Sequence, residues 1–149
     1  MKRREIRELA YKALFAVDTN QDDPLHQLVY IADDWEMAGY PEGGQGLSAA
    51  MMKDAYSEQL LTGVLSHLDE LDNIIRGYSQ EWDLERLGVA ERTVLRIGLY
   101  EMLHEERLHP AIAINEAIDL IKKYGEPEAF RLVNGILGKK AEELNTANQ

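Results

Sequence analysis

The chain has 149 residues, no cysteine, and 27 acidic against 16 basic side chains, which gives a formal net charge of −11. One domain is the usual organisation at this length. The lack of cysteine excludes a disulfide scaffold, a thiolate nucleophile and a cysteine-ligated zinc site. The charged start MKRREIRELA is unlike a secretory signal and no run of 18 apolar residues occurs, so we expect a soluble, cytoplasmic protein.

The first half of the chain reads as helix interrupted by one loop. Apolar residues recur at helical spacing from Ile6 to Val17, which predicts a helix over about residues 3–17. A weaker helix follows at about 25–32. The segment GYPEGGQG contains four Gly and one Pro, so we expect a flexible loop at about 39–48. Ser48 is a plausible N-cap for a third helix, predicted to run unbroken to about Gly77.

The second half carries the most strongly patterned helices. A short helical turn is expected at about 82–87, and the helix over 90–105 has so little polar surface that we predict it to be the central one. Pro110 should open the next helix and Gly125 should end it. The last helix should begin near Pro127. No segment alternates with period two, so the predicted fold class is all-α, with six to seven helices.

Two glycines lie inside the last predicted helix, Gly135 and Gly138. Each costs about 1 kcal/mol relative to alanine in a helix interior. We interpret the pair as a requirement for close approach by another helix or backbone.

The negative charge is unevenly distributed along the chain. Residues 1–16 carry five bases against two acids, a net of +3, and residues 17–75 carry twelve acids and one base, a net of −11. Residues 76–149 carry ten bases and thirteen acids, a net of −3. A net charge of −11 means that the protein as a whole repels nucleic acid. Residues 1–16 are positively charged, however, so phosphate attracts this segment.

Four basic side chains crowd the first turns of the first helix: Lys2, Arg3, Arg4 and Arg7. Each cation there opposes the helix dipole at a cost of about 0.3–1 kcal/mol, so a purely structural explanation starts at a disadvantage. Arg4, Arg7 and Tyr11 follow at i, i+3 and i+7, a face that would combine phosphate pairing with base stacking. A solubilising terminus, partly offset by neighbouring glutamates, explains the same pattern about equally well.

Catalytic and metal-binding patterns are nearly absent. The four histidines form no His-x-x-x-His or His-Glu-x-x-His pair, and Glu101 with His104 supplies only half of the paired motif of a di-metal bundle. The glycine cluster lacks the Lys-Ser/Thr of a phosphate-binding loop. We therefore predict no enzyme activity, no cofactor and no metal.

Three segments resemble one family closely: VLRIGLYEML at 94–103, AINEAIDLIKKY at 113–124 and VNGIL at 133–137. They are similar to the signature segments of NusB, a family of bacterial transcription antitermination factors. The arginine-rich start with Ala13, Leu14 and Phe15 resembles the beginning of that family, whereas residues 18–50 do not. The resemblance implies a single helical domain over residues 1–149, built from two packed helical sub-bundles, and a non-enzymatic role.

The resemblance also implies partners. NusB-like proteins pair with NusE, which is also a small-subunit ribosomal protein. Together they bind the boxA element of nascent RNA and help RNA polymerase read through terminators, notably in ribosomal RNA operons. A basic partner would suit the acidic stretch, because complementary charge steers association.

By position, the resemblance assigns RNA binding to two places: the segment Lys2, Arg3, Arg4 and Arg7, and the start of the last helix at Glu128. It assigns NusE contact to Phe15 and Glu91. Position 132, often aromatic in the family, is Leu132 here. The alternative is a helical protein-interaction domain that acts as a homodimer without binding RNA directly.

Overall fold

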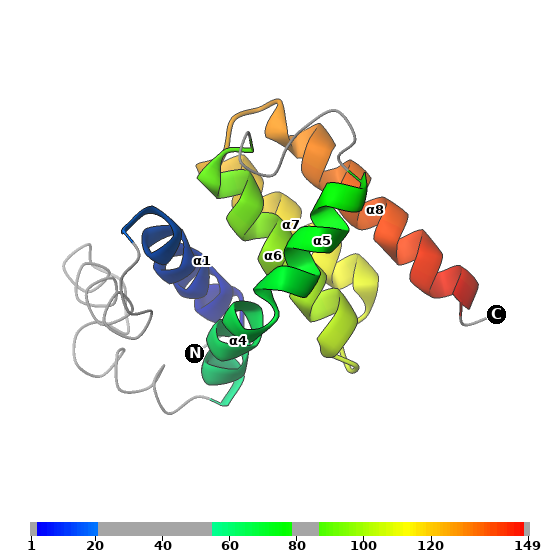
Figure 1. Cartoon of the computed structure of the whole chain (residues 1–149), viewed down its shortest axis with the longest axis horizontal. Helices are drawn as coiled ribbons and strands as arrows, with labels where there is room; N and C mark the ends of the chain where they lie inside the picture. Colours follow the sequence, from blue (N-terminus) through cyan, green and yellow to red (C-terminus); the bar gives the residue numbers. More distant parts are fainter. Residues whose placement is uncertain (1–2, 21–54, 79–86, 148–149) are drawn as a thin grey trace. The chain divides into compact units, whose positions relative to one another are not determined.

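The computed structural model describes residues 3–20, 55–78 and 87–147. Within these ranges the secondary structure consists of six α-helices and no strand (Figure 1), which confirms the all-α prediction. The helix predicted at 25–32, the loop at 39–48 and the N-cap Ser48 lie outside the described residues, as does nearly all of the turn at 82–87. In the described part of the chain, no helix has the length and apolar character that crossing a membrane requires.

The chain divides into two compact units, Met1–Leu65 and Ser66–Gln149. The first unit contains α1 (Arg3–Asn20) and nearly all of α4 (Ala55–Ser66). Most of the apolar stripe predicted for the first helix is buried, and so are most of the described apolar side chains of α4. The buried residues of these two helices include Ile6, Leu9, Ala10, Ala13, Leu14, Tyr56, Leu60, Leu61 and Val64.

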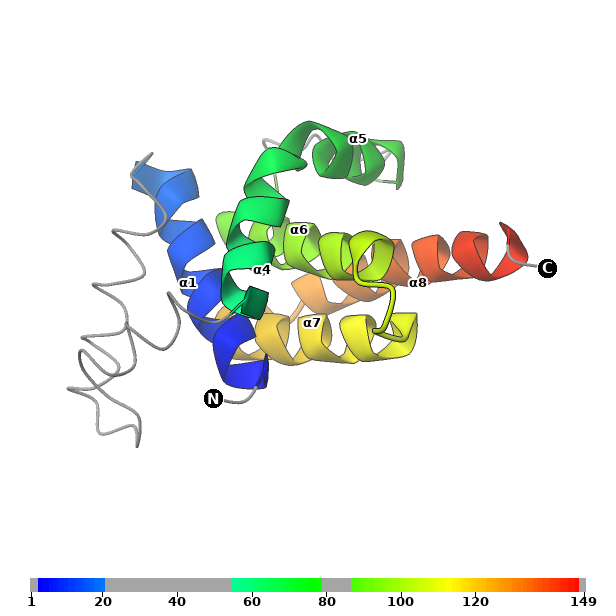
Figure 2. The same cartoon turned by 90° about the horizontal axis from the view of Figure 1, so that it is seen from below.

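The second unit contains α5 (Leu68–Tyr78), α6 (Val89–His104), α7 (Pro110–Tyr124) and α8 (Ala129–Ala147). Helix α6 packs against α5, α7 and α8, and Figure 2 shows α7 and α8 beside it. Nine consecutive or near-consecutive residues of α6 from Thr93 to Met102 are buried. The prediction that this helix is central is therefore confirmed within its unit.

Gly98 is the point of closest approach in this packing. A Cβ atom at Gly98 would lie 3.0 Å from Cδ1 of Leu137 on α8 and 3.5 Å from Cβ of Ala117 on α7. By contrast, a Cβ at Gly135 or Gly138 would meet no atom within 4 Å. The predicted close approach at those two glycines is wrong, because α8 packs through Val133, Ile136 and Leu137 instead.

The long helix predicted from Ser48 to Gly77 is also wrong, because α4 ends at Ser66 and α5 begins at Leu68. The apolar spacing continues through the break, so periodicity alone does not detect it. A second signal was present in the sequence: Ser66 followed three residues later by Asp69 is the pattern of a helix N-terminus. Asp69 and Glu70 stand in the first turn of α5, where the helix dipole favours acids.

The ends of α7 agree with the sequence. Pro110 occupies the first turn, and Nδ1 of His109 accepts a hydrogen bond from the backbone N–H of Ala111 at 3.0 Å. At the other end the N–H of Gly125 donates to the carbonyl oxygen of Ile121 at 2.8 Å. A Cβ on Gly125 would lie 3.0 Å from that oxygen and closer still to the Ile121 side chain, so a larger residue at the stop would have to displace that side chain.

Candidate binding surfaces

The arginines of α1 divide into exposed and buried side chains. Arg3 and Arg4 are exposed, and the Arg3 guanidinium lies 4.3 Å from the ring centroid of Tyr56 on α4. Such stacking holds a guanidinium over an aromatic face while its N–H donors stay available. Lys2, the remaining member of the predicted basic segment, lies outside the described residues.

Arg7 and Tyr11 are buried, with exposed fractions of 4% and 3%. Arg7 donates a hydrogen bond from Nη2 to the Tyr56 hydroxyl at 3.4 Å, and the guanidinium carbon lies 5.8 Å from the centroid of that ring. Arg4, Arg7 and Tyr11 therefore do not form the exposed face that their spacing suggested, because the buried stripe of α1 is wide enough to include the last two. Only Arg4 of the three presents its side chain to solvent.

Phe15 is partly exposed on α1, one turn after Tyr11, and the two ring centroids are 5.9 Å apart. This contact gives the Phe15 ring a fixed neighbour within α1 while leaving part of it accessible. That arrangement suits an aromatic anchor for a protein partner.

A pocket of about 510 Å³ lies in the second unit, where the start of α6 meets the start of α8. Glu91 and Glu128, which the resemblance assigned to different partners, line this one pocket together with Leu132. Glu91 stands in the first turn of α6, and its carboxylate lies directly against Gly88, where a methyl group would overlap it. The complete lining is Leu87, Gly88, Glu91, Glu126, Glu128, Ala129, Arg131 and Leu132.

The charged lining of this pocket is mainly acidic, with three carboxylates, from Glu91, Glu126 and Glu128, and one guanidinium, from Arg131. Such a lining attracts a basic side chain more strongly than a phosphate. Glu126 and Arg131 were missed in the sequence. Their position within five residues of Pro127, at the predicted start of a helix, was the available signal.

The arrangement so far defines a class: an all-helical protein with an exposed pair of arginines on its first helix and an acidic pocket between two later helix starts. Comparison with known proteins narrows the class to one family. The sequence model of the NusB family matches residues 4–142 of the chain. The chain belongs to the NusB family.

Relatives support this assignment over nearly the whole sequence. The transcription antitermination protein NusB of an Exiguobacterium species is 34% identical over 96% of this chain and 99% of its own length. The protein of the same name from Heliobacterium modesticaldum is 36% identical over 99% of this chain, which spans 66% of that longer relative.

Solved structures agree with the fold. T. maritima NusB superposes with a TM-score of 0.78 at 30% identity, covering 96% of this chain and 92% of that one. A structure of antitermination factors NusB and NusE in complex with double-stranded RNA gives a TM-score of 0.74 at 24% identity, covering 95% of this chain and 96% of that one. The second likeness concerns the fold alone.

Proposed function

We propose that this protein is a transcription antitermination factor that binds boxA-type nascent RNA together with NusE and promotes read-through by RNA polymerase, notably in ribosomal RNA operons. The observation that carries the proposal is the likeness to NusB proteins along residues 4–142, which includes both the arginine-bearing helix and the acidic pocket. The name of the relatives, transcription antitermination protein NusB, supports it. The protein acts in the cytoplasm, by binding and without catalysis.

RNA contact is assigned to the exposed start of α1. Arg3 and Arg4 have accessible guanidinium groups, which can pair with phosphate oxygens or stack on bases. Lys2 belongs to the same segment, and Arg7 supports it from inside through Tyr56. RNA affinity of the protein alone should be modest, because the segment that attracts phosphate is short and the whole protein has a net charge of −11.

Contact with NusE is assigned to Phe15 in the first unit and to the pocket of Glu91 in the second. A basic segment of the partner would meet three carboxylates in that pocket, an arrangement that favours association with a cationic protein. Glu128 lines the same pocket, so its carboxylate can accept from the partner or from an amino group of a base. When two proteins of one complex each bind the same RNA weakly, the first contact raises the effective concentration for the second. The complex therefore binds RNA with higher affinity than either protein does alone.

The test is fluorescence anisotropy of a labelled single-stranded boxA-type RNA, titrated with the full chain plus NusE at several salt concentrations. Arg4→Ala should weaken binding several-fold and lower the salt dependence by about 0.7 in logarithmic slope for each phosphate that the variant no longer neutralises. Arg107→Ala, which removes an exposed arginine from the turn after α6, is the matched control and should change neither quantity.

The partner assignment is tested on the same proteins by measuring NusE affinity without RNA. Glu91→Ala should weaken it, whereas Glu106→Ala, which removes an exposed carboxylate beyond the end of α6, should not.

An RNA affinity and a salt slope that the joint change Arg3→Ala and Arg4→Ala leaves unchanged would show that α1 is not the RNA contact. A tight homodimer in light scattering that neither NusE nor RNA perturbs would favour the homodimeric interaction domain.

A further inference from the structure

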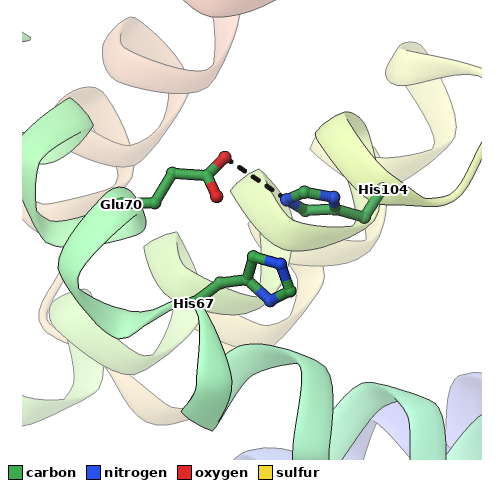
Figure 3. Close-up of side chains that lie close together, drawn as sticks. All are labelled: His67, Glu70 and His104. Carbon is green, nitrogen blue, oxygen red and sulfur yellow. Dashed lines mark hydrogen bonds and ion pairs between the residues drawn. The ribbon is translucent and has the colours of Figure 1, made fainter.

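Three side chains of metal-ligating type meet between α5 and α6, and none of them belongs to the binding surfaces described above. Figure 3 shows His67, which directly precedes α5, Glu70 from the first turn of α5 and His104 from the end of α6 directed into one small space. One ligand atom from each residue lies within 4.8 Å of the others. The cluster combines two imidazoles and one carboxylate, from α6, from α5 and from the residue that precedes α5.

The local sequence places two of the donors on one face. His67 directly precedes α5 and Glu70 follows three residues later, a spacing that makes side chains neighbours at a helix start. His104 is in the last turn of α6, where the carbonyl end of the helix dipole favours a cation. Because α5 packs against α6, the two faces meet.

An ion pair beside the cluster fixes α5 against α6. Arg96 donates from Nε to Asp72 Oδ1 at 2.8 Å and from Nη2 to Oδ2 at 3.0 Å, and both side chains are only 14% exposed. A two-pronged pair of this kind defines distance and orientation. Asp72 follows Glu70 by two residues on α5, so the pair holds the ligand-bearing turn in place.

The separation of two of the donors matches that of ligands on one bound ion. His104 Nε2 lies 3.3 Å from Glu70 Oε1. Two ligands of a tetrahedral zinc ion, at bonds of about 2.0–2.1 Å, lie about 3.3 Å apart. The ring centroids of His67 and His104 are 4.3 Å apart, and a ring nitrogen of His67 lies within 4.8 Å of both other ligand atoms.

Neighbouring groups orient both imidazoles. The ring of the buried Tyr100 stacks on His104 with a centroid distance of 5.1 Å and lies 5.8 Å from that of His67. Ser66 Oγ is 3.3 Å from Nδ1 of His67. Metal-binding histidines are commonly held in this way by contacts outside the metal's own ligands.

We propose that His67, Glu70 and His104 bind one Zn²⁺ ion. Two imidazole nitrogens and one carboxylate oxygen form a donor set known for zinc, which leaves the fourth position to water or to a group from a partner. Calcium and magnesium prefer oxygen ligands throughout, so they suit this cluster poorly. An ion pair between Glu70 and His104 accounts for two of these residues but not for the position of His67 beside them. A metal site accounts for all three.

The site has a structural consequence that is independent of the proposed function. The ion would tie the beginning of α5 to the end of α6, at the place where the chain leaves α4. His104 is 31% and Glu70 45% exposed, so an ion can enter from solvent. The prediction of no metal rested on known ligand motifs in the sequence, whereas this set combines residues 37 positions apart in the chain.

The test uses the full chain, stripped of metal with EDTA and titrated with zinc chloride in a calorimeter. We expect one Zn²⁺ per chain and a rise in melting temperature with zinc concentration, because an ion that binds only the folded state stabilises it. Co²⁺ in place of Zn²⁺ should give the strong visible absorption of tetrahedral coordination. His67→Ala, Glu70→Gln and His104→Ala should each weaken zinc binding by about tenfold or more.

The matched control is His109→Asn, which removes the nearby histidine that caps α7 and keeps a capping side chain in its place. It should leave zinc affinity unchanged. The proposal is overturned if the full chain takes up no stoichiometric zinc, if the three cluster variants bind as well as the original chain, or if His109→Asn weakens binding as much as they do. The first outcome needs no variant, so a folding defect cannot obscure the test.

Discussion

The guanidinium of Arg7 is enclosed in the protein and donates a hydrogen bond to the hydroxyl of Tyr56, 49 positions further along the chain. A basic residue of the predicted RNA-binding segment therefore acts as part of the core. Its charge is held over the Tyr56 ring, next to the exposed guanidinium of Arg3 on the same ring. The aromatic ring of α4 thus connects an internal arginine with an external one.

The first prediction follows from this arrangement. Arg7→Ala should lower the free energy of unfolding by about 2 kcal/mol, because it removes a desolvated cation–π contact and leaves the Tyr56 hydroxyl without that donor. Arg4→Ala, three residues earlier and exposed, should change it by at most about 0.5 kcal/mol. Urea unfolding followed by circular dichroism measures both. Equal stability of the two variants would mean that the buried contact contributes nothing.

The second prediction concerns the ion pair of Arg96 and Asp72. Asp72→Ala should lower the free energy of unfolding by about 2 kcal/mol, because it removes two charge-assisted hydrogen bonds from a guanidinium that is 14% exposed. A double-mutant cycle with Arg96→Ala should give a coupling energy of about 1–3 kcal/mol. Glu106→Ala, on an exposed carboxylate, is the control and should have little effect. Additive single changes would show that the two charges are not coupled.

The helices could be predicted because their pattern is local. The stripe from Ile6 to Val17 and the stop at Gly125 depend on neighbours within one or two turns, and both appear in the structure as expected. The break at His67 was missed because apolar spacing continues across it.

The candidate sites were harder to predict because they depend on which helix faces meet. The sequence around Arg7 does not indicate that Tyr56, 49 positions away, is its partner. A basic residue of an amphipathic helix is therefore expected to face solvent. The same spacing along α1 assigned Arg4 to solvent, and Arg4 is exposed. Glu91 and Glu128 line one pocket, and the cluster of His67, Glu70 and His104 lies between α5 and α6. In both cases the packing of helices distant in sequence brings the side chains together, and a local sequence pattern does not reveal that packing.

The third prediction compares two helical glycines. Gly135→Ala should raise the free energy of unfolding by about 0.5–1 kcal/mol, since a Cβ there meets nothing within 4 Å and alanine favours helix. Gly98→Ala should lower it by about 1 kcal/mol, because the new methyl group would press on the fully buried Leu137. Thermal unfolding of the two variants in parallel distinguishes them. Stabilisation by both would show that α6 and α8 have room to separate.

The last prediction concerns alkaline pH. Tyr78 on α5 donates a hydrogen bond to Glu143 on α8. Burial, followed by that hydrogen bond and the negative charge of Glu143, raises the pKa of the Tyr78 hydroxyl from 10.0 to about 12. The folded protein therefore holds this proton more tightly than the unfolded chain does. The resulting stability is complete below pH 10 and is lost as the pH rises through about 12.

Glu143→Gln keeps a hydrogen-bond acceptor and removes the charge, so the pKa of Tyr78 should fall towards 10.0. Spectrophotometric titration of tyrosinate, compared with Tyr78→Phe to identify the relevant step, measures the change. Glu142→Gln, the adjacent exposed carboxylate, is the control and should leave that step where it is. If Tyr78→Phe removed no step near pH 12, the bond between α5 and α8 would not hold the proton in solution.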